Sequence, residues 1–337
     1  MTPREIIKRS IHFQDPPRVG MYFSRFGWND TVDVFDFYIR DPHGVDPWGL
    51  TWETHPDIPS IGMPKHPLVA SLEDLDKLLP PDPKEFAARV AGKWSGPDRF
   101  RSPTPVPGAA VPVLSLKSLT PEDREKYRFI AASCGIWEIP HFLRGMEALC
   151  EDMIVQPELA HRLIAFCADF WVAFLKELAP LKGEIDAIYM FDDWGTQQDA
   201  MISPAMWREF FAKPYRRITD AAHVNGMDFW LHSCGRVTNL IGDFVEAGID
   251  LVNPYQSAAC GYEEVAKRYA GKIAFLTTVD TQSTLTHGTP DQVLAECRRL
   301  EKWKTPHGGL IVASYPYDTP EANERVVFDY FRKGKLP

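Results

Sequence analysis

The stretch LHSCGRV, Leu231 to Val237, sets a histidine and a cysteine two residues apart with a glycine directly behind them. His232 and Cys234 come at the end of a short apolar run, which is typical of the point where a buried strand ends. Imidazole nitrogen and thiolate sulfur are both preferred ligands of zinc. The pair is therefore either two metal ligands at a strand end or two small groups that fill a turn.

Other apolar runs of the chain also end in polar residues. Asp192 and Asp193 follow the run AIYMF, and adjacent residues of a strand point to opposite faces, so we expect only Asp193 to face the site. It would serve as general acid or base, bind a cationic group, or ligate a metal, whereas Asp192 could cap a helix. The remaining residues at such ends are Arg25, Gln197, Gln256, Asp280, Gln282 and Tyr315.

Short apolar runs alternate with longer helical patterns over the C-terminal two-thirds of the chain. The predicted strands are 18–23, 128–133, 186–191, 227–232, 249–254, 273–278 and 309–314, and 109–116 could be an eighth. Helix starts are predicted at Ser203-Pro204, Thr289-Pro290 and Thr319-Pro320, each a capping residue followed by a proline. Repeated βα units of this kind predict a closed (β/α)₈ barrel, with an open doubly wound sheet as second choice. In such a barrel the active site lies where the strands end.

The segment from about residue 30 to 125 fits this scheme poorly because it is rich in proline and in loop-type residues. We expect it to be an insertion that covers one end of the barrel, within a single domain that spans residues 1–337.

Composition excludes several classes of partner. The chain has 37 lysines and arginines against 46 acidic residues, a net charge of −9 without a basic block, so nucleic acid and anionic membrane surfaces are not expected partners. The apolar runs are too short to span a bilayer. The six cysteines are scattered singly, which fits a reducing compartment, and we expect the protein in the cytosol.

Several segments, taken together, resemble the uroporphyrinogen decarboxylase superfamily, and within it the corrinoid-linked methyltransferase branch. They are DPWGLTWE, LRGMEALCEDMIVQPELAHRL, MFDDWGTQQDAMISPAMWREFF, LHSCGRV with EAGIDLVNPYQ, and TVDTQSTLTHGTPDQV. The resemblance implies a (β/α)₈ barrel, in agreement with the strand count.

The resemblance also implies a zinc site, in which His-x-Cys is joined by a second cysteine after the last strand. His232 and Cys234 match, but the last strand leads into VASYPYDTP, with Tyr315 near the place of the missing cysteine. Cys260 is the candidate for the third ligand, and Asp193 or Asp280 could supply an oxygen instead.

Decarboxylases of the superfamily hold their polycarboxylate substrate with an arginine-rich loop, of which this chain keeps only Arg25, in MYFSRFGWND. The resemblance therefore favours methyl transfer between a corrinoid and a small thiol or folate. The expected catalytic residues are Asp193, His232, Cys234 and Tyr315, and the expected substrate contacts are Arg25, Gln197, Gln256, Asp280 and Gln282. A corrinoid protein is the expected transient partner, and a homodimer is left open. The alternatives are decarboxylation of a porphyrinogen-like polycarboxylate and a non-catalytic barrel that only binds a ligand or partner.

Overall fold

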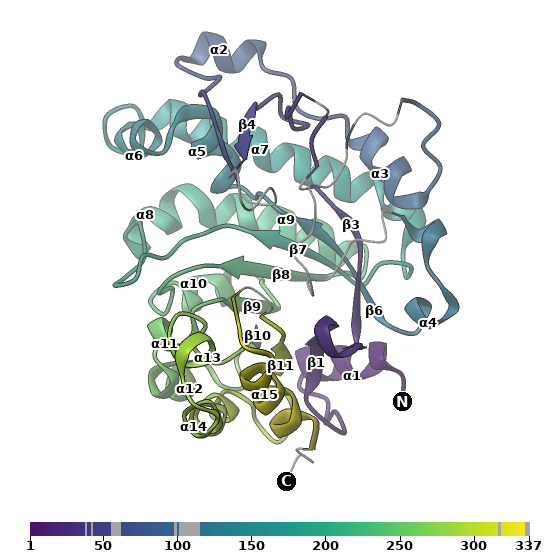
Figure 1. The fold of residues 1–337 in the computed structure, drawn as a ribbon. Coiled ribbons are helices and arrows are strands. Elements are labelled where there is room, and N and C mark those ends of the chain that lie inside the picture. The colour runs from purple at the N-terminus through teal and green to yellow at the C-terminus, as the bar shows by residue number, and fades with distance from the viewer. Residues whose placement is uncertain are drawn as a thin grey trace.

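Eight parallel strands form one strongly curved sheet, and the predicted (β/α)₈ barrel is confirmed (Figure 1). The computed structural model describes residues 1–37, 39–41, 43–54, 62–97, 100, 115–315 and 318–333. The parallel strands are β1 (Gly20–Phe23), β3 (Thr31–Asp36), β6 (Tyr127–Ala132), β7 (Ala187–Phe191), β8 (Asp228–Ser233), β9 (Leu251–Pro254), β10 (Ala274–Thr277) and β11 (Leu310–Ala313). The order across the sheet is β2-β1-β11-β10-β9-β8-β7-β6-β3, where β2 (Trp28–Asn29) pairs antiparallel with β1.

The barrel closes between β1 and β3, the two parallel strands at the ends of this order. Asp30, just before β3, bridges them. Its backbone N–H donates to the carbonyl of Met21 at 2.9 Å, and its carboxylate accepts the N–H of Met21 at 2.8 Å. Arg18 adds two charged hydrogen bonds to the same carboxylate, at 2.6 and 2.7 Å.

The eighth strand is β3, which lies inside the segment that was predicted to be an insertion. That boundary is wrong, because residues 31–36 pair with β6 and the excursion begins only after them. The run TVDVFD is broken by Asp33 and Asp36, so it lacks the continuous apolar pattern of the other strands. Of the alternative strand 109–116, residues 109–114 lie outside the described residues, and Leu116 begins a short 3₁₀ helix, Leu116–Ser118.

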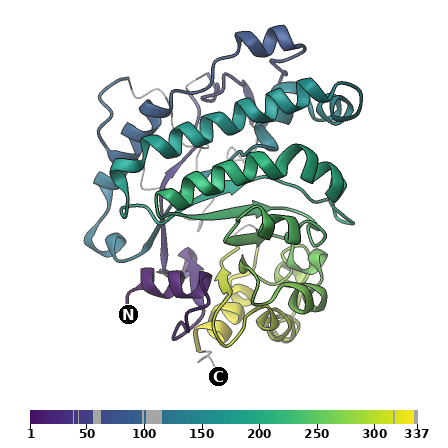
Figure 2. The same cartoon turned by 180° about the vertical axis from the view of Figure 1, so that it is seen from behind.

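Helices surround the sheet, and Figure 2 shows the long α7 (Pro157–Glu177) beside α9 (Lys213–Val224) on its outer side. Ser203 and Thr289 cap α8 (Pro204–Trp207) and α14 (Pro290–Leu300) as predicted, whereas α15 (Glu321–Lys333) begins one residue after Pro320. A π-helical turn, Arg208–Ala212, joins α8 to α9 just before Pro214, which has no N–H to donate. The other helices of the C-terminal half are α10 (Ile241–Glu246), α11 (Ser257–Cys260), α12 (Tyr262–Tyr269) and α13 (Thr284–His287).

Alternate residues of the strands fill the barrel interior. Tyr127, Phe129, Trp230 and Ile311 belong to one buried cluster, separate from the larger core between sheet and helices. Helix α1 (Pro3–Ile11) closes the end of the barrel where the strands begin, because its residues Ile7 and Ile11 join this inner cluster.

The excursion after β3 contains the hairpin β4 (Trp52–Thr54) and β5 (Gly62–Pro64), then α2 (Leu72–Lys77) and α3 (Pro83–Ala91). Helix α4 (Pro121–Arg124) precedes β6, and α5 (Glu138–Arg144) and α6 (Met146–Val155) follow it. No helix among the described residues has both the length and the apolar character needed to cross a membrane.

Candidate metal and substrate site

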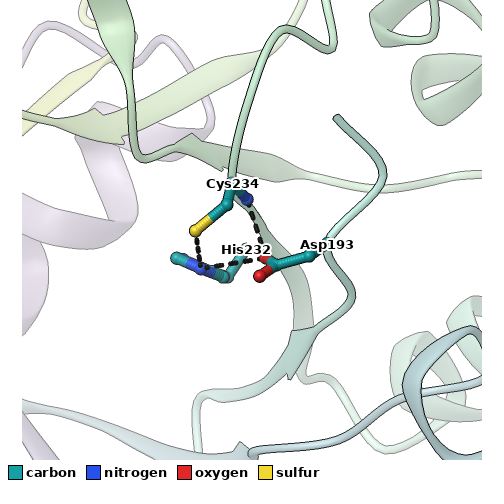
Figure 3. Close-up of side chains that lie close together, drawn as sticks. All are labelled: Asp193, His232 and Cys234. Atoms are coloured by element: carbon teal, nitrogen blue, oxygen red, sulfur yellow. Dashed lines mark hydrogen bonds and ion pairs between the residues drawn. The ribbon is translucent and has the colours of Figure 1, made fainter. Parts of the chain in front are cut away.

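Three side chains from two neighbouring strands meet at the mouth of the barrel (Figure 3). Asp193 follows β7, His232 lies near the end of β8, and Cys234 follows it. The Nε2 atom of His232 lies 3.5 Å from Oδ1 of Asp193 and 3.6 Å from Sγ of Cys234. The backbone N–H of Cys234 donates to the same Oδ1 at 2.8 Å. The two loops are thus tied together at the point where the side chains converge.

Strand register explains why these residues meet. Phe191 of β7 pairs with His232 of β8, so the two strands end at the same level. Side chains alternate along a strand, and Tyr189, Phe191 and Trp230 belong to the interior cluster. His232 continues the inward series of β8, and its ring lies 4.8 Å from that of Phe191.

Asn253 of β9 fixes the orientation of the His232 ring. Its Oδ1 accepts hydrogen bonds from His232 Nδ1 and from the hydroxyl of Tyr189, both at 2.6 Å, and its amide nitrogen donates to the carbonyl of Leu276. The carbonyl contact sets which end of the amide faces His232, so Nδ1 carries the proton and Nε2 points to Asp193 and Cys234. This role of Asn253 was not predicted, although its pairing opposite His232 follows from the barrel register.

The charges of the cluster depend on one another. Burial lowers the pKa of His232, but its hydrogen bonds to Asp193 and Cys234 outweigh burial and raise that pKa to about 10. Burial in turn raises the pKa of Asp193, and the hydrogen bond and charge of His232 outweigh it, so the pKa of Asp193 is lowered. In the absence of a metal, an imidazolium–carboxylate pair therefore occupies the site at neutral pH.

Asp192 points the other way and caps helix α5. Its carboxylate accepts the backbone N–H groups of Ile136, Trp137 and Glu138 at 2.9 to 3.0 Å, together with the hydroxyl of Tyr215. Burial raises the pKa of Asp192 to about 7. The two adjacent aspartates thus divide as strand alternation requires, one toward the mouth and one into the surrounding core.

Cys260 does not join the cluster. Its thiol is buried and donates to the carbonyl of Gly235 at 3.4 Å, and burial raises its pKa. The expectation that Cys260 supplies the third ligand is therefore wrong. Of the two predicted oxygen alternatives, Asp193 places its oxygen with the other two donor atoms, all within 4.8 Å of one another.

Two more predicted residues hold backbone near the site. Gln256 accepts the N–H of Gly235 at 2.5 Å, which fixes the turn behind Cys234. Asp280 accepts the N–H of Gln282 at 3.0 Å and the hydroxyl of Ser283, so its carboxylate stabilises its own loop.

The remaining predicted residues lie farther from the cluster. Arg25 forms an ion pair with the buried Glu324 at 2.6 Å, and Gln197 and Gln282 are exposed on their loops. Tyr315 packs on the ring of Tyr255 at 5.1 Å, and Tyr255 packs on His232 at 5.2 Å. Tyr315 therefore contacts the site through an intervening ring.

The loops that carry Asp193 and Cys234 touch through two glycines. A Cβ built on Gly195 would lie 2.6 Å from the backbone nitrogen of Arg236, and one built on Gly235 would lie 2.2 Å from the carbonyl carbon of Gly195. Gly235 also has φ of 75°, which favours glycine. The glycine behind His232-x-Cys234 is thus required for the close approach of the two loops.

The donor types, imidazole, thiolate and carboxylate, fit zinc, and two of their three separations can be compared with a zinc site. Ligand distances of about 2.0 to 2.3 Å in a tetrahedral site place neighbouring donor atoms roughly 3.3 to 3.8 Å apart. The separations of 3.5 and 3.6 Å around His232 Nε2 lie in that range. The hydrogen bond from Nδ1 to Asn253 is the outer contact that zinc-binding histidines usually make. His232, Cys234 and Asp193 would hold the ion, which leaves a fourth position for a substrate.

A cavity of about 380 Å³ opens over His232 and Asp193. Its wall combines aromatic rings from the β4–β5 hairpin, α5 and β7 with acidic and small polar groups, among them Trp52, Glu138, Phe142 and Phe191. Two of the three candidate ligands, His232 and Asp193, therefore line a pocket large enough for a small organic molecule.

A profile of the family described as uroporphyrinogen decarboxylase (URO-D) matches residues 85–334. The chain belongs to the uroporphyrinogen decarboxylase family. The family resemblance read from the sequence is thereby confirmed. A search of curated protein sequences finds no significant match.

Comparison with solved structures supports the fold of this URO-D chain through a methyltransferase. A methyltransferase from Methanosarcina mazei superposes with a TM-score of 0.52 at 13% identity, over 64% of this chain and 60% of the other. A D-psicose 3-epimerase gives a TM-score of 0.40 at 9% identity, over 66% of this chain and 82% of its own. The match spans less than two thirds of the methyltransferase, so the likeness establishes the fold of this URO-D family member and not its reaction.

Proposed function

We propose that this chain is a zinc-dependent methyltransferase that moves a methyl group between a corrinoid and a small acceptor such as a thiol or a folate. The observation that carries the proposal is the convergence of His232 Nε2, Cys234 Sγ and Asp193 Oδ1 beside a cavity that His232 and Asp193 line. The methyltransferase from Methanosarcina mazei, which shares the fold, is consistent with it.

Each residue has a defined part in this proposal. Zinc held by His232, Cys234 and Asp193 would bind a substrate thiol as its thiolate, the nucleophilic form. Asn253 keeps Nε2 of His232 directed at the site, and the N–H of Cys234 holds the Asp193 carboxylate in place. Phe191, packed on the imidazole, limits the access of water to it.

Decarboxylation of a porphyrinogen-like polycarboxylate is less well supported. A substrate with many carboxylates needs several cationic partners. Arg25, the one arginine that the decarboxylase pattern retains, is paired with Glu324. Among the cavity-wall residues that the structure describes, none is lysine or arginine, whereas Glu138 and Asp193 are acidic.

Elemental analysis of the purified protein tests the metal site. We expect stoichiometric zinc in the wild type, its loss in Cys234→Ala and Asp193→Ala, and its retention in the control Cys260→Ala, since Cys260 lies outside the cluster. Retention of zinc by Cys234→Ala would show that the ion is bound elsewhere.

The reaction itself is tested with methylcobalamin and a panel of small thiols, by following the loss of the methylated corrinoid in the visible spectrum. We expect demethylation that depends on Cys234. Conversion of uroporphyrinogen to coproporphyrinogen by the same preparation would favour the decarboxylase instead.

Partner and compartment follow from the same proposal. A corrinoid carrier protein would dock over the barrel mouth and present its methyl group to the cavity. All six cysteines are free thiols, which supports a reducing compartment such as the cytosol.

A further inference from the structure

The described wall of the cavity combines aromatic rings with acidic side chains and holds no lysine or arginine. Trp52 comes from the β4–β5 hairpin, Phe142 from α5 and Phe191 from β7, so aromatic rings from three elements line the cavity. The rings of Trp52 and Phe142 pack edge to face at 5.3 Å. The acidic groups of the cavity wall are Glu138 and Asp193.

Glu138 is held in place as a fixed negative charge. Its Oε1 accepts the N–H of Asp193 and its Oε2 contacts Nε2 of His141, both at 3.2 Å. The side chain is 16% exposed and forms part of the cavity wall. A divalent ion between Cys234 and Asp193 would offset the charges of those two ligands, so the charge of Glu138 would remain.

Two arginines lie near the cavity without forming part of its described wall. The guanidinium of Arg40 packs on the ring of Trp52 at 4.4 Å and lines a separate small void with Asp46. Arg144, at the end of α5, forms a hydrogen-bonded ion pair with Asp152 at 2.6 Å. Neither belongs to the described wall of the cavity.

We propose that the small molecule that enters this cavity is an organic cation with a compact methylated ammonium head, and that Glu138, Trp52 and Phe142 recognise it. Aromatic faces attract ammonium groups, and a carboxylate in a partly desolvated site adds to that attraction. The inference rests on the proposed function only in taking this cavity as the entrance for the small-molecule substrate.

Three probes of the same shape and different charge test the inference on the intact protein. They are choline, its uncharged isostere 3,3-dimethylbutan-1-ol, and the anion 3,3-dimethylbutanoate, titrated by calorimetry at neutral pH. We expect choline to bind about tenfold more tightly than the alcohol, with the anion weakest. Equal or tighter binding of the anion, or no detectable binding of choline, would overturn the inference.

Two variants test which residues cause the preference for choline over the alcohol. Glu138→Gln keeps an oxygen that can accept the N–H of Asp193 but removes the charge, so the preference for choline over the alcohol should fall by about tenfold. Trp52→Leu should weaken choline more than the alcohol. Glu177→Gln, on the exposed end of α7, is the matched control and should leave both affinities unchanged. A cation preference that survives Glu138→Gln in full would contradict the role of this residue.

The outcomes separate this inference from the proposed function. A preference for choline in a protein that neither holds zinc nor demethylates methylcobalamin would leave the binding inference standing alone. Zinc binding and methyl transfer together with a preference for the anionic probe would refute only the binding inference.

Discussion

Asn253 determines which nitrogen of His232 faces the cavity, because its oxygen accepts the proton of Nδ1. Replacing it with leucine removes that acceptor while the site stays filled. We expect Asn253→Leu to weaken zinc binding about 10- to 100-fold, the usual effect of losing such an outer contact. Competition with a coloured chelator measures the affinity.

Asn239→Leu, at an exposed position, is the control and should bind zinc like the wild type. Thermal unfolding of both variants shows whether any loss reflects the fold. Unchanged zinc affinity in a folded Asn253→Leu protein would mean that the strands alone orient the imidazole.

Replacing each of the two adjacent aspartates with alanine should have opposite effects on stability and on zinc binding. Asp192→Ala leaves two buried and one part-buried N–H group at the start of α5 without their acceptor, so the free energy of unfolding should fall by about 3 kcal/mol. Asp193→Ala should abolish zinc binding and lower that free energy much less. Urea denaturation and metal content measure the two effects. Loss of zinc in Asp192→Ala and loss of stability in Asp193→Ala would mean that the two roles are assigned the wrong way round.

At this scale the sequence could predict part of the site. Strand alternation separated Asp193 from Asp192, and the His-x-Cys spacing indicated His232 and Cys234. The third donor could not be chosen, because Cys260 was favoured by its sulfur chemistry, while its burial against Gly235 depends on how two loops pack.

Among the elements, the contact between the loops after β7 and β8 positions the donor atoms. Gly235→Ala would place a methyl group against the backbone of Gly195, so the loops must separate and move Cys234 away from Asp193. We expect loss of stability together with at least about tenfold weaker zinc binding. Differential scanning fluorimetry and chelator competition measure these quantities.

Gly226→Ala provides a matched control for backbone strain. Gly226 has φ of 71°, close to that of Gly235, but the nearest atom to an added Cβ is a lysine side-chain carbon 3.7 Å away. This variant should lose stability and keep its zinc affinity. Equal loss of zinc in both variants would mean that general destabilisation explains the effect.

Strands were predictable wherever both faces are buried. The runs that became β6 to β11 are continuous and apolar, as parallel strands between helices must be. β3 was missed because Asp33 and Asp36 occupy positions that pair with Phe129 and Ala131 of β6. Acidic residues within a barrel strand therefore hide it from a search for continuous apolar runs.

For the whole molecule, the end of the barrel opposite the cavity should make stability depend on pH. His12, which follows α1, forms an ion pair with Asp228 of β8 at 3.0 Å, and this hydrogen bond raises the pKa of His12. The folded state therefore keeps a proton that the unfolded chain loses near pH 6.5. This stabilisation is complete below about pH 6.5 and is lost as pH rises through the higher folded pKa.

We expect the free energy of unfolding to fall between about pH 6.5 and the folded pKa of His12, and to fall less in His12→Asn. Because His12 is partly exposed, the difference should stay below about 1 kcal/mol. Urea denaturation at a series of pH values measures it. If the free energy of unfolding depends on pH in His12→Asn as it does in the wild type, His12 is not the source of that dependence.

Helix α1 also determines how a bound molecule can enter and leave the barrel. Since Ile7 and Ile11 plug one end of the cylinder, a molecule bound above His232 must depart through the opening by which it arrived. A carrier protein seated over that opening would trap whatever lies beneath. Binding would then have to be ordered, with the small reactant first and the carrier protein second.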